Sequence, residues 1–311
     1  MTVVAEPEIS TVWRPAYPVD ARLTLSLLGH HRGDPRHRET PDGAVWRTSR
    51  MSSGPVSYRI TQTTWPEVTA TAWGPGAAEL IAGVPDLLGA RDDPDGFEPR
   101  HPLLERAHAR LTGLRIPATG RVMEALIPAV LEQKVLGIDA AAGWRRLVGR
   151  FGEPAPGPAP TGMRVPPTAE QWLAVPSWEW HKAGVDQRHA TTVLACARYA
   201  AKLERVAAEA ADPQDVYRLL TAIPGVGPWT AAQVGHRALG DADALPIGDY
   251  HLASMSGYAL TGKALDEGEV EAFYAPWRPH RFRVVRLLEL TPGSLPPRRG
   301  PRLSRQDYRR I

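Results

Sequence analysis

The segment Ile223–Ala231 reads Ile-Pro-Gly-Val-Gly-Pro-Trp-Thr-Ala, and it decides the fold of this chain. An apolar, helix-like stretch, Val216–Leu220, runs into it, and a second helix-like stretch begins at about Trp229. The two glycines permit backbone angles that a side chain would forbid, and they let a large ligand approach the main chain closely. We expect the amides of Val226, Gly227 and the next helical turn to point outward at the positive end of a helix. Such a site binds an anion, for example a nucleic-acid phosphate.

The turn alone is equally typical of two ordinary helices joined through a C-cap glycine, so the surrounding segments decide. Three of them match one family in order and in spacing: Ile127–Val135, Leu245–His251 and Pro276–Pro279. Together with the hairpin, they resemble the helix-hairpin-helix, Gly/Pro, Asp (HhH-GPD) DNA glycosylases, and in particular the 3-methyladenine DNA glycosylase II (AlkA) type. The resemblance runs from about Tyr17 to Leu290 and is strongest from Gly113 onward.

The resemblance implies a mainly α (α+β) fold, in which the helix-hairpin-helix glycosylase region follows a small N-terminal antiparallel β-sheet domain. It also implies a monofunctional DNA glycosylase of base excision repair. Such an enzyme hydrolyses the N-glycosidic bond of a flipped, damaged base, here expected to be alkylated, and leaves an abasic site. Two alternatives stay open: a non-catalytic helix-hairpin-helix DNA-binding protein, and a glycosylase for a mismatched or bulky lesion. The expected partner is double-stranded DNA with a damaged base, bound by a monomer in the cytoplasm, at the nucleoid.

Asp249 is the candidate catalytic residue. Cleavage of an N-glycosidic bond builds positive charge on the sugar, so the enzyme needs an anion beside the sugar and a nucleotide that has left the stack. Asp249 begins a helix predicted over Asp249–Leu260, where a carboxylate is also a preferred N-cap. Its spacing from the hairpin matches the catalytic aspartate of the family, which favours catalysis. Asp241 and Asp243 are interpreted as loop residues.

Trp229 stands where the superfamily members that also cut the DNA backbone carry a lysine, which forms a Schiff base with the sugar. Because an indole cannot form one, the resemblance implies that water attacks. Ile116 and Pro117 match the family loop that inserts an apolar wedge into the duplex, although a core isoleucine before a proline is an equally good interpretation. The hairpin residues predicted to bind DNA are Gly225, Val226, Gly227, Trp229 and Thr230.

The pocket for the base is expected to be less aromatic than that of well-known relatives. Electron-rich rings attract a cationic alkylated purine, although most buried tryptophans simply fill a core. Gln233 falls where those relatives have a tyrosine, and Arg286 falls near their late aromatic pair. Gln133 matches a family glutamine, or is a buried amide that bonds to the backbone. The predicted pocket residues are Trp229, Tyr250, Gln133, Gln233, Trp277 and Arg286.

Composition limits the function classes. The chain has 311 residues, a net charge of +3 and a pI near 9.1, which permits DNA binding without demonstrating it. The single cysteine, Cys196, excludes a disulfide framework and the four-cysteine iron–sulfur cluster of some superfamily members. No apolar run suggests a membrane span, and the N-terminus has no signal pattern. No cofactor is expected, except that the resemblance implies a structural Na⁺ or K⁺ held by the carbonyls of Ala222, Pro224 and Val226.

The pattern along the chain predicts four parts: a disordered N-terminus over 1–16, an α+β domain over 17–101, a two-lobed helical glycosylase region over 102–291 and a disordered Arg/Pro-rich tail over 292–311. Three strands are predicted at Ala44–Thr48, Val56–Thr61 and Val68–Ala72, whereas Leu23–Leu27 fits a strand or a helix. Ser177–His181 is interpreted as a loop, because tryptophans two residues apart cannot share a helical face. The other predicted helices are Leu103–Leu111, Arg121–Val135, Ala140–Phe151, Thr168–Ala174, Gln187–Glu209, Asp215–Leu220, Trp229–Leu239, Glu267–Tyr274 and Pro279–Leu290.

Overall fold

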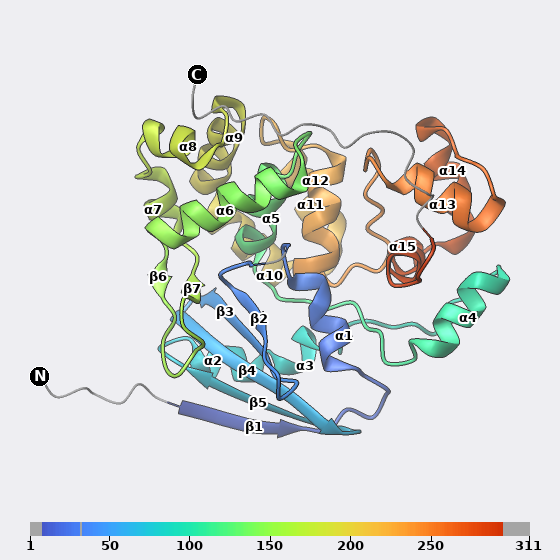
Figure 1. The fold of residues 1–311 in the computed structure, drawn as a ribbon, viewed down its shortest axis with the longest axis horizontal. Coiled ribbons are helices and arrows are strands. Elements are labelled where there is room, and N and C mark those ends of the chain that lie inside the picture. Colours follow the sequence, from blue (N-terminus) through green and yellow to red (C-terminus); the bar gives the residue numbers. More distant parts are fainter. Residues whose placement is uncertain (1–7, 32, 295–311) are drawn as a thin grey trace, which may run out of the picture.

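The computed structural model describes residues 8–31 and 33–294. Its N-terminal part holds a five-stranded antiparallel sheet, and helices make up most of the remainder (Figure 1). The predicted fold class, mainly α with a small sheet, is confirmed. Within the two described ranges, no helix combines the length and the apolar character needed to cross a membrane.

The sheet has the strand order β1-β5-β4-β3-β2. Its inward-facing residues alternate along the strands because successive side chains point to opposite faces, and Tyr58 and Ile60 of one strand are at most 2% exposed. Helix α2 (Ala77–Ala82) packs on β1, β4 and β5 and closes this core. The three predicted strands are confirmed within β3, β4 and β5. The strands are β1 (Glu8–Trp13), β2 (His37–Glu39), β3 (Val45–Met51), β4 (Gly54–Thr64) and β5 (Glu67–Trp73).

Two expectations for the N-terminal region are resolved by the structure. The prediction that residues 1–16 are disordered is wrong for Glu8–Trp13, which pair with β5 as an edge strand. Residues 1–7, and the predicted tail from residue 295 onward, lie outside the described residues. The ambiguous stretch Leu23–Leu27 is helical: α1 (Ala21–Leu25) continues as the 3₁₀ turn η1 (Ser26–Leu28). The Asp20 side chain caps α1 by accepting from the amide of Leu23, which favours a helix at this point.

The helical region surrounds two hydrophobic cores, which lie above the sheet in Figure 1. The first core is built by α5 (Val122–Leu131), α6 (Gly137–Phe151), α7 (Ala169–Leu173), α8 (Ser177–Ala183), α9 (Gln187–Arg198), α10 (Ala200–Glu209), α11 (Pro213–Thr221) and α12 (Pro228–Val234). The second is built by α4 (Pro102–Arg110), α13 (Leu252–Thr261), α14 (Val270–Tyr274) and α15 (Arg281–Glu289). The remaining elements are shorter: α3 (Val84–Leu87), β6 (Glu153–Pro154), β7 (Arg164–Val165), η2 (Gly235–Leu239), η3 (Glu267–Glu269) and η4 (Ala275–Trp277).

Three local predictions in this region are wrong. Ser177–His181 is not a loop but lies within α8, where Trp180 is buried at 2% exposure and Trp178 is 61% exposed, so the two rings need no common face. The single helix predicted over Gln187–Glu209 breaks at Tyr199 into α9 and α10. The helix predicted from Asp249 begins only at Leu252.

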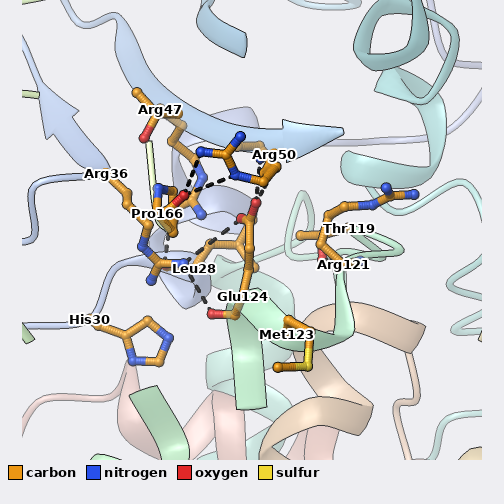
Figure 2. Close-up of polar contacts among 12 residues, drawn as sticks. Leu28, His30, Arg36, Arg47, Arg50, Thr119, Arg121, Met123, Glu124 and Pro166 are labelled. Carbon is orange, nitrogen blue, oxygen red and sulfur yellow. Dashed lines mark hydrogen bonds and ion pairs between the residues drawn. The ribbon is translucent and has the colours of Figure 1, made fainter. Parts of the chain in front are cut away.

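The sheet is attached to the helical region by a polar cluster around Glu124 of α5 (Figure 2). The Glu124 carboxylate accepts from the Ser49 hydroxyl at 2.6 Å and from the Arg50 amide at 2.7 Å, both on β3. The Arg36 guanidinium donates to the main-chain oxygen of Glu124 at 3.0 Å. The Arg50 guanidinium donates to the carbonyl of Pro166 at 2.8 Å and 3.0 Å. These contacts position the end of η1 against the helices that carry the site described next.

Candidate active site

The hairpin joins α11 to α12 through a glycine in a left-handed conformation. Gly225 has φ +91°, and a Cβ there would come within 2.3 Å of the Thr192 hydroxyl, so this position requires glycine. Gly227 is the extended N-cap of α12, and Pro228 takes the first helical position. Among the described residues, the amides of Gly227 and Trp229 have no hydrogen-bond partner. They are therefore free to bind an anion.

One predicted donor of the hairpin faces inward instead. The amide of Val226 donates to the carbonyl of Ile223 at 3.0 Å and closes the turn, so it does not point outward as expected. The Val226 side chain is 5% exposed and Thr230 is 2% exposed, so both side chains belong to the hairpin interior. The Thr230 hydroxyl lies 2.8 Å from the side-chain nitrogen of Gln133.

Gln133 holds the hairpin in place and does not line the cavity described below. Its Nε2 donates to the carbonyl of Gly225 at 2.9 Å as well as to Thr230. Its own main-chain oxygen lies 2.8 Å from Nε2 of His189. Gln133 therefore does not line the base pocket as predicted. It bonds to the backbone, which is the alternative that the sequence left open.

The structure places the predicted wedge in a core. Ile116 is fully buried and packs with α4, α13 and α15, while its amide donates to the Asp92 carboxylate at 3.0 Å. Pro117 is also buried. Two exposed apolar side chains, Val135 at 39% and Ile138 at 56%, follow Gln133 in the sequence, and Gln133 itself bonds to the hairpin. Of the two interpretations that the sequence left open for Ile116, the structure therefore favours the core isoleucine.

Asp249 lies in the loop before α13, and two donors orient its carboxylate. Oδ2 accepts from the indole nitrogen of Trp229 at 3.0 Å, and Oδ1 accepts from the amide of His251 at 2.9 Å. The second contact is an Asx-type turn, in which an aspartate bonds the backbone two residues further on. His251, not Asp249, occupies the N-cap position of α13. The carboxylate is thus held by the hairpin helix and by its own loop.

A cavity of about 660 Å³ opens beside Asp249. Its volume is in the range that accommodates a small organic ligand. Its wall combines η1, Gln233 of α12, part of η2, the loop before α13 with the start of that helix, and α15 with the residues that follow it. Of the predicted pocket residues, Gln233 and Arg286 line it, and Trp229 reaches it through Asp249.

Two predicted pocket aromatics lie elsewhere. Trp277 is 9% exposed, packs against Tyr274 and donates its indole N–H to the carbonyl of Pro99 at 2.9 Å, so it belongs to the second core. Tyr250 is 81% exposed and meets only the edge of the His251 ring, with the ring centroids 4.9 Å apart. Neither of these two rings therefore lines the cavity, where they were predicted to bind a cationic base.

Several residues that line the cavity were not predicted from the sequence. Ser26, His236, Arg237, Phe282 and Glu289 all contribute to its wall. The rings of His236 and Phe282 stack with centroids 3.8 Å apart, and burial followed by the neighbouring Arg237 lowers the pKa of His236 well below its usual value. Arg237 could have been identified, because it follows Gln233 by one helical turn.

The neighbouring aspartates are structural. Asp241 accepts from the Tyr217 hydroxyl at 2.5 Å, and burial raises the pKa of its carboxyl group. Asp243 binds the Arg281 guanidinium, with both its oxygens 2.8 Å from guanidinium nitrogens. Both carboxylates are engaged in holding the loop, which leaves Asp249 as the carboxylate of this loop that lines the cavity.

Comparison with known proteins agrees with the hairpin and the fold, although no protein-family model matches the chain. The probable bifunctional transcriptional activator/DNA repair enzyme AlkA of Mycobacterium tuberculosis is 30% identical over 277 residues, which cover 83% of this chain and 52% of the relative. The chain thus spans about half the length of the curated relative it matches.

Solved structures share the architecture. A 3-methyladenine DNA glycosylase from Archaeoglobus fulgidus superimposes with a TM-score of 0.74 at 17% identity, covering 90% of this chain and 97% of the other. An 8-oxoguanine glycosylase/lyase from Clostridium acetobutylicum, solved with double-stranded DNA, gives a TM-score of 0.68 at 12% identity, covering 93% and 97%. The chain therefore has the fold of the helix-hairpin-helix DNA glycosylases and is related in sequence to an AlkA protein, which confirms the resemblance to that superfamily.

Proposed function

We propose that this chain is a monofunctional DNA glycosylase that releases a damaged base and leaves an abasic site. The observation that carries the proposal is the position of Asp249. Its carboxylate lines a cavity of about 660 Å³ and is fixed by the indole of Trp229, one residue into the hairpin helix. The residue that would stabilise the sugar is thus directly attached to the element that would bind the DNA backbone.

The chemistry follows from this arrangement. As the base departs, the sugar gains positive charge, and a carboxylate that is already oriented stabilises this charge without reorganising. Water then attacks the sugar. None of the four lysines of the chain lines the cavity, so no lysine amine is placed to form a Schiff base with the sugar. This supports hydrolysis without cleavage of the DNA backbone.

The partner is double-stranded DNA bound by a monomer. The amides of Gly227 and Trp229, unpaired among the described residues, are available to bind a phosphate. The exposed Val135 and Ile138 are candidates to fill the gap left by a flipped nucleotide. The carbonyls of Ala222, Pro224 and Val226 accept no hydrogen bond from the described residues, which fits a structural Na⁺ or K⁺. A DNA substrate places the protein at the nucleoid.

The names of the relatives support an alkylated base as the first substrate class to test. The AlkA relative is named as a DNA repair enzyme, and the Archaeoglobus structure is named as a 3-methyladenine DNA glycosylase. A glycosylase for another lesion is the second candidate, because Trp277 and Tyr250 do not line the cavity and the 8-oxoguanine enzyme has the same fold.

The test separates binding from catalysis. Alkylated genomic DNA is incubated with the wild-type protein and with Asp249→Asn, and released bases are identified by mass spectrometry while DNA binding is measured by fluorescence anisotropy. We expect base release by the wild type, and loss of release with retained binding in the variant. A wild type that binds DNA but releases no base from any lesion of a broad panel would instead identify a non-catalytic binding protein.

A further inference from the structure

The hydrogen-bonding side chains of the cavity present donors to a bound base. Gln233 is the clearest case. Its Oε1 accepts from Nη1 of Arg237, and because a guanidinium can only donate, this contact fixes which way the amide points. The Nε2 group of Gln233 has no hydrogen-bond partner among the described residues, although the side chain is only 7% exposed. A donor that is nine-tenths buried is therefore available at the cavity wall.

Two guanidinium groups add to this set. Arg237 also donates to the main-chain oxygen of Gln233 at 3.3 Å and to Nε2 of His236. Arg286 of α15 donates to the Glu289 carboxylate at 2.8 Å and to the Ser26 hydroxyl at 2.6 Å. Both arginines line the cavity and neither can accept a hydrogen bond.

Several side-chain acceptors of the cavity already have donors, whereas the Ser294 hydroxyl has no hydrogen-bond partner among the described residues. The Glu289 carboxylate is paired with Arg286. The Ser26 oxygen accepts from Arg286 and donates its own proton to the carbonyl of Leu23 at 2.6 Å. Nε2 of His236 accepts from Arg237, and both oxygens of Asp249 are engaged. A base that approaches Gln233 thus meets a free amide donor, while the acceptors of Ser26, His236 and Asp249 named here are already engaged.

We propose, on the basis of the glycosylase function above, that this cavity prefers purines with a carbonyl group at C6 to purines with an amino group at C6, and that Gln233 sets the preference. A carbonyl oxygen accepts from the Gln233 amide and from the guanidinium groups, as arginine does when it binds O6 of guanine. An amino group at C6 is itself a donor, so it cannot accept from the Gln233 amide. The buried amide of Gln233 is then left without a hydrogen-bond partner.

The experiment compares two lesions that carry their methyl group at the same ring position. Methylated genomic DNA contains 3-methylguanine, with a carbonyl at C6, and 3-methyladenine, with an amino group there. Mass spectrometry measures the release of each base, and each rate is divided by the rate of uncatalysed loss. We expect the rate enhancement for 3-methylguanine to exceed that for 3-methyladenine by about tenfold or more.

Gln233→Glu replaces the donor with an acceptor of the same shape. We expect it to reduce the enhancement for 3-methylguanine by about tenfold or more, and to leave that for 3-methyladenine unchanged or raised. Gln233→Leu, which removes the donor without adding charge, is expected to reduce the preference and guards against misfolding of the first variant. Gln214→Glu is the matched control, since Gln214 is exposed in the first turn of α11 and far from the cavity lining.

The outcomes separate the two proposals. A wild type that favours 3-methyladenine, or Gln233 variants that lower both rates equally, would overturn the preference while leaving the glycosylase function in place. A wild type that releases neither base, nor any other lesion of the panel, removes the proposed function and the preference with it.

Discussion

The indole nitrogen of Trp229 donates a hydrogen bond of 3.0 Å to Oδ2 of Asp249, across 20 positions of sequence. Trp229 is the second residue of α12, the helix that follows the glycine turn. The contact means that the element expected to bind the DNA backbone also fixes the carboxylate expected to face the sugar. Any displacement of the hairpin is therefore transmitted to Asp249.

Trp229→Phe tests this contact, because it keeps an aromatic ring and removes the donor. We expect single-turnover base release to slow by about tenfold, which corresponds to the loss of roughly 1.4 kcal/mol of orientation and charge stabilisation. DNA affinity is expected to change little. Trp178→Phe is the control, since Trp178 is 61% exposed on α8. An unchanged release rate in Trp229→Phe would show that the indole does not position the carboxylate.

The absence of a lysine from the cavity lining predicts that no covalent intermediate forms. Incubation with damaged DNA and sodium borohydride is expected to trap no protein–DNA adduct, and the product strand stays intact until alkali cleaves the abasic site. Trp229→Lys serves as a comparison, because it introduces an amine beside the carboxylate. A trapped adduct with the wild-type protein contradicts the hydrolytic mechanism.

The two hairpin glycines are expected to respond differently to substitution by alanine. Gly225→Ala forces a side chain into φ +91° and against Thr192, so we expect the free energy of unfolding to fall by more than about 1 kcal/mol. Gly227→Ala meets no atom within 4 Å of its new Cβ, and its φ of −104° suits alanine, so stability is expected to change by less than about 0.5 kcal/mol.

The same pair reports on DNA binding. Because the open space at Gly227 is where a phosphate would approach the free amides, Gly227→Ala is expected to weaken binding to all DNA sequences by a similar factor. Chemical denaturation and fluorescence anisotropy measure the two effects. Full DNA affinity in Gly227→Ala would place the backbone contact elsewhere on the molecule.

Stability is expected to fall as the pH drops below about 6.5. Burial lowers the pKa of His30 from 6.5 to about 4, so between these values the unfolded chain takes up a proton that the folded chain does not. Each pH unit in this window then removes about 1.4 kcal/mol of stability through this residue. His30→Gln is expected to flatten the curve of unfolding free energy against pH by about one proton, whereas substitution of the exposed His181 by glutamine leaves the slope unchanged. An unaltered slope in His30→Gln assigns the pH dependence to other groups.

The sequence predicted those parts of the site that depend on local chain geometry. The glycine turn at Gly225 and the spacing to Asp249 are local signals, and the structure brings both residues into one arrangement. Burial is not local, so the sequence could not decide between a wedge and a core residue for Ile116, whose amide is held by Asp92 inside a core. The prediction that Trp277 lines the base pocket was wrong, because this residue packs against Tyr274 in the second core and does not line the cavity.

The cavity wall could not be predicted for the same physical reason. Ser26 and Arg286 are 260 positions apart, and only the folded chain brings the hydroxyl within 2.6 Å of the guanidinium. The donor character of the pocket depends on such pairs and on the orientation of Gln233. A sequence shows which groups are present, but not which of them already satisfy one another.

Because Ser26, Leu27 and Gly29 form part of the cavity wall, the N-terminal sheet domain is not a detachable accessory. Arg36 anchors that domain to Glu124 of α5, so we expect a substitution at either residue to alter the proposed glycosylase activity without changing a residue that lines the cavity. In a mutational survey of this protein, harmful positions are therefore expected to extend across both halves of the molecule. If the chain is the proposed glycosylase, substitutions in η1 as well as in the helices are expected to change which damaged bases it releases.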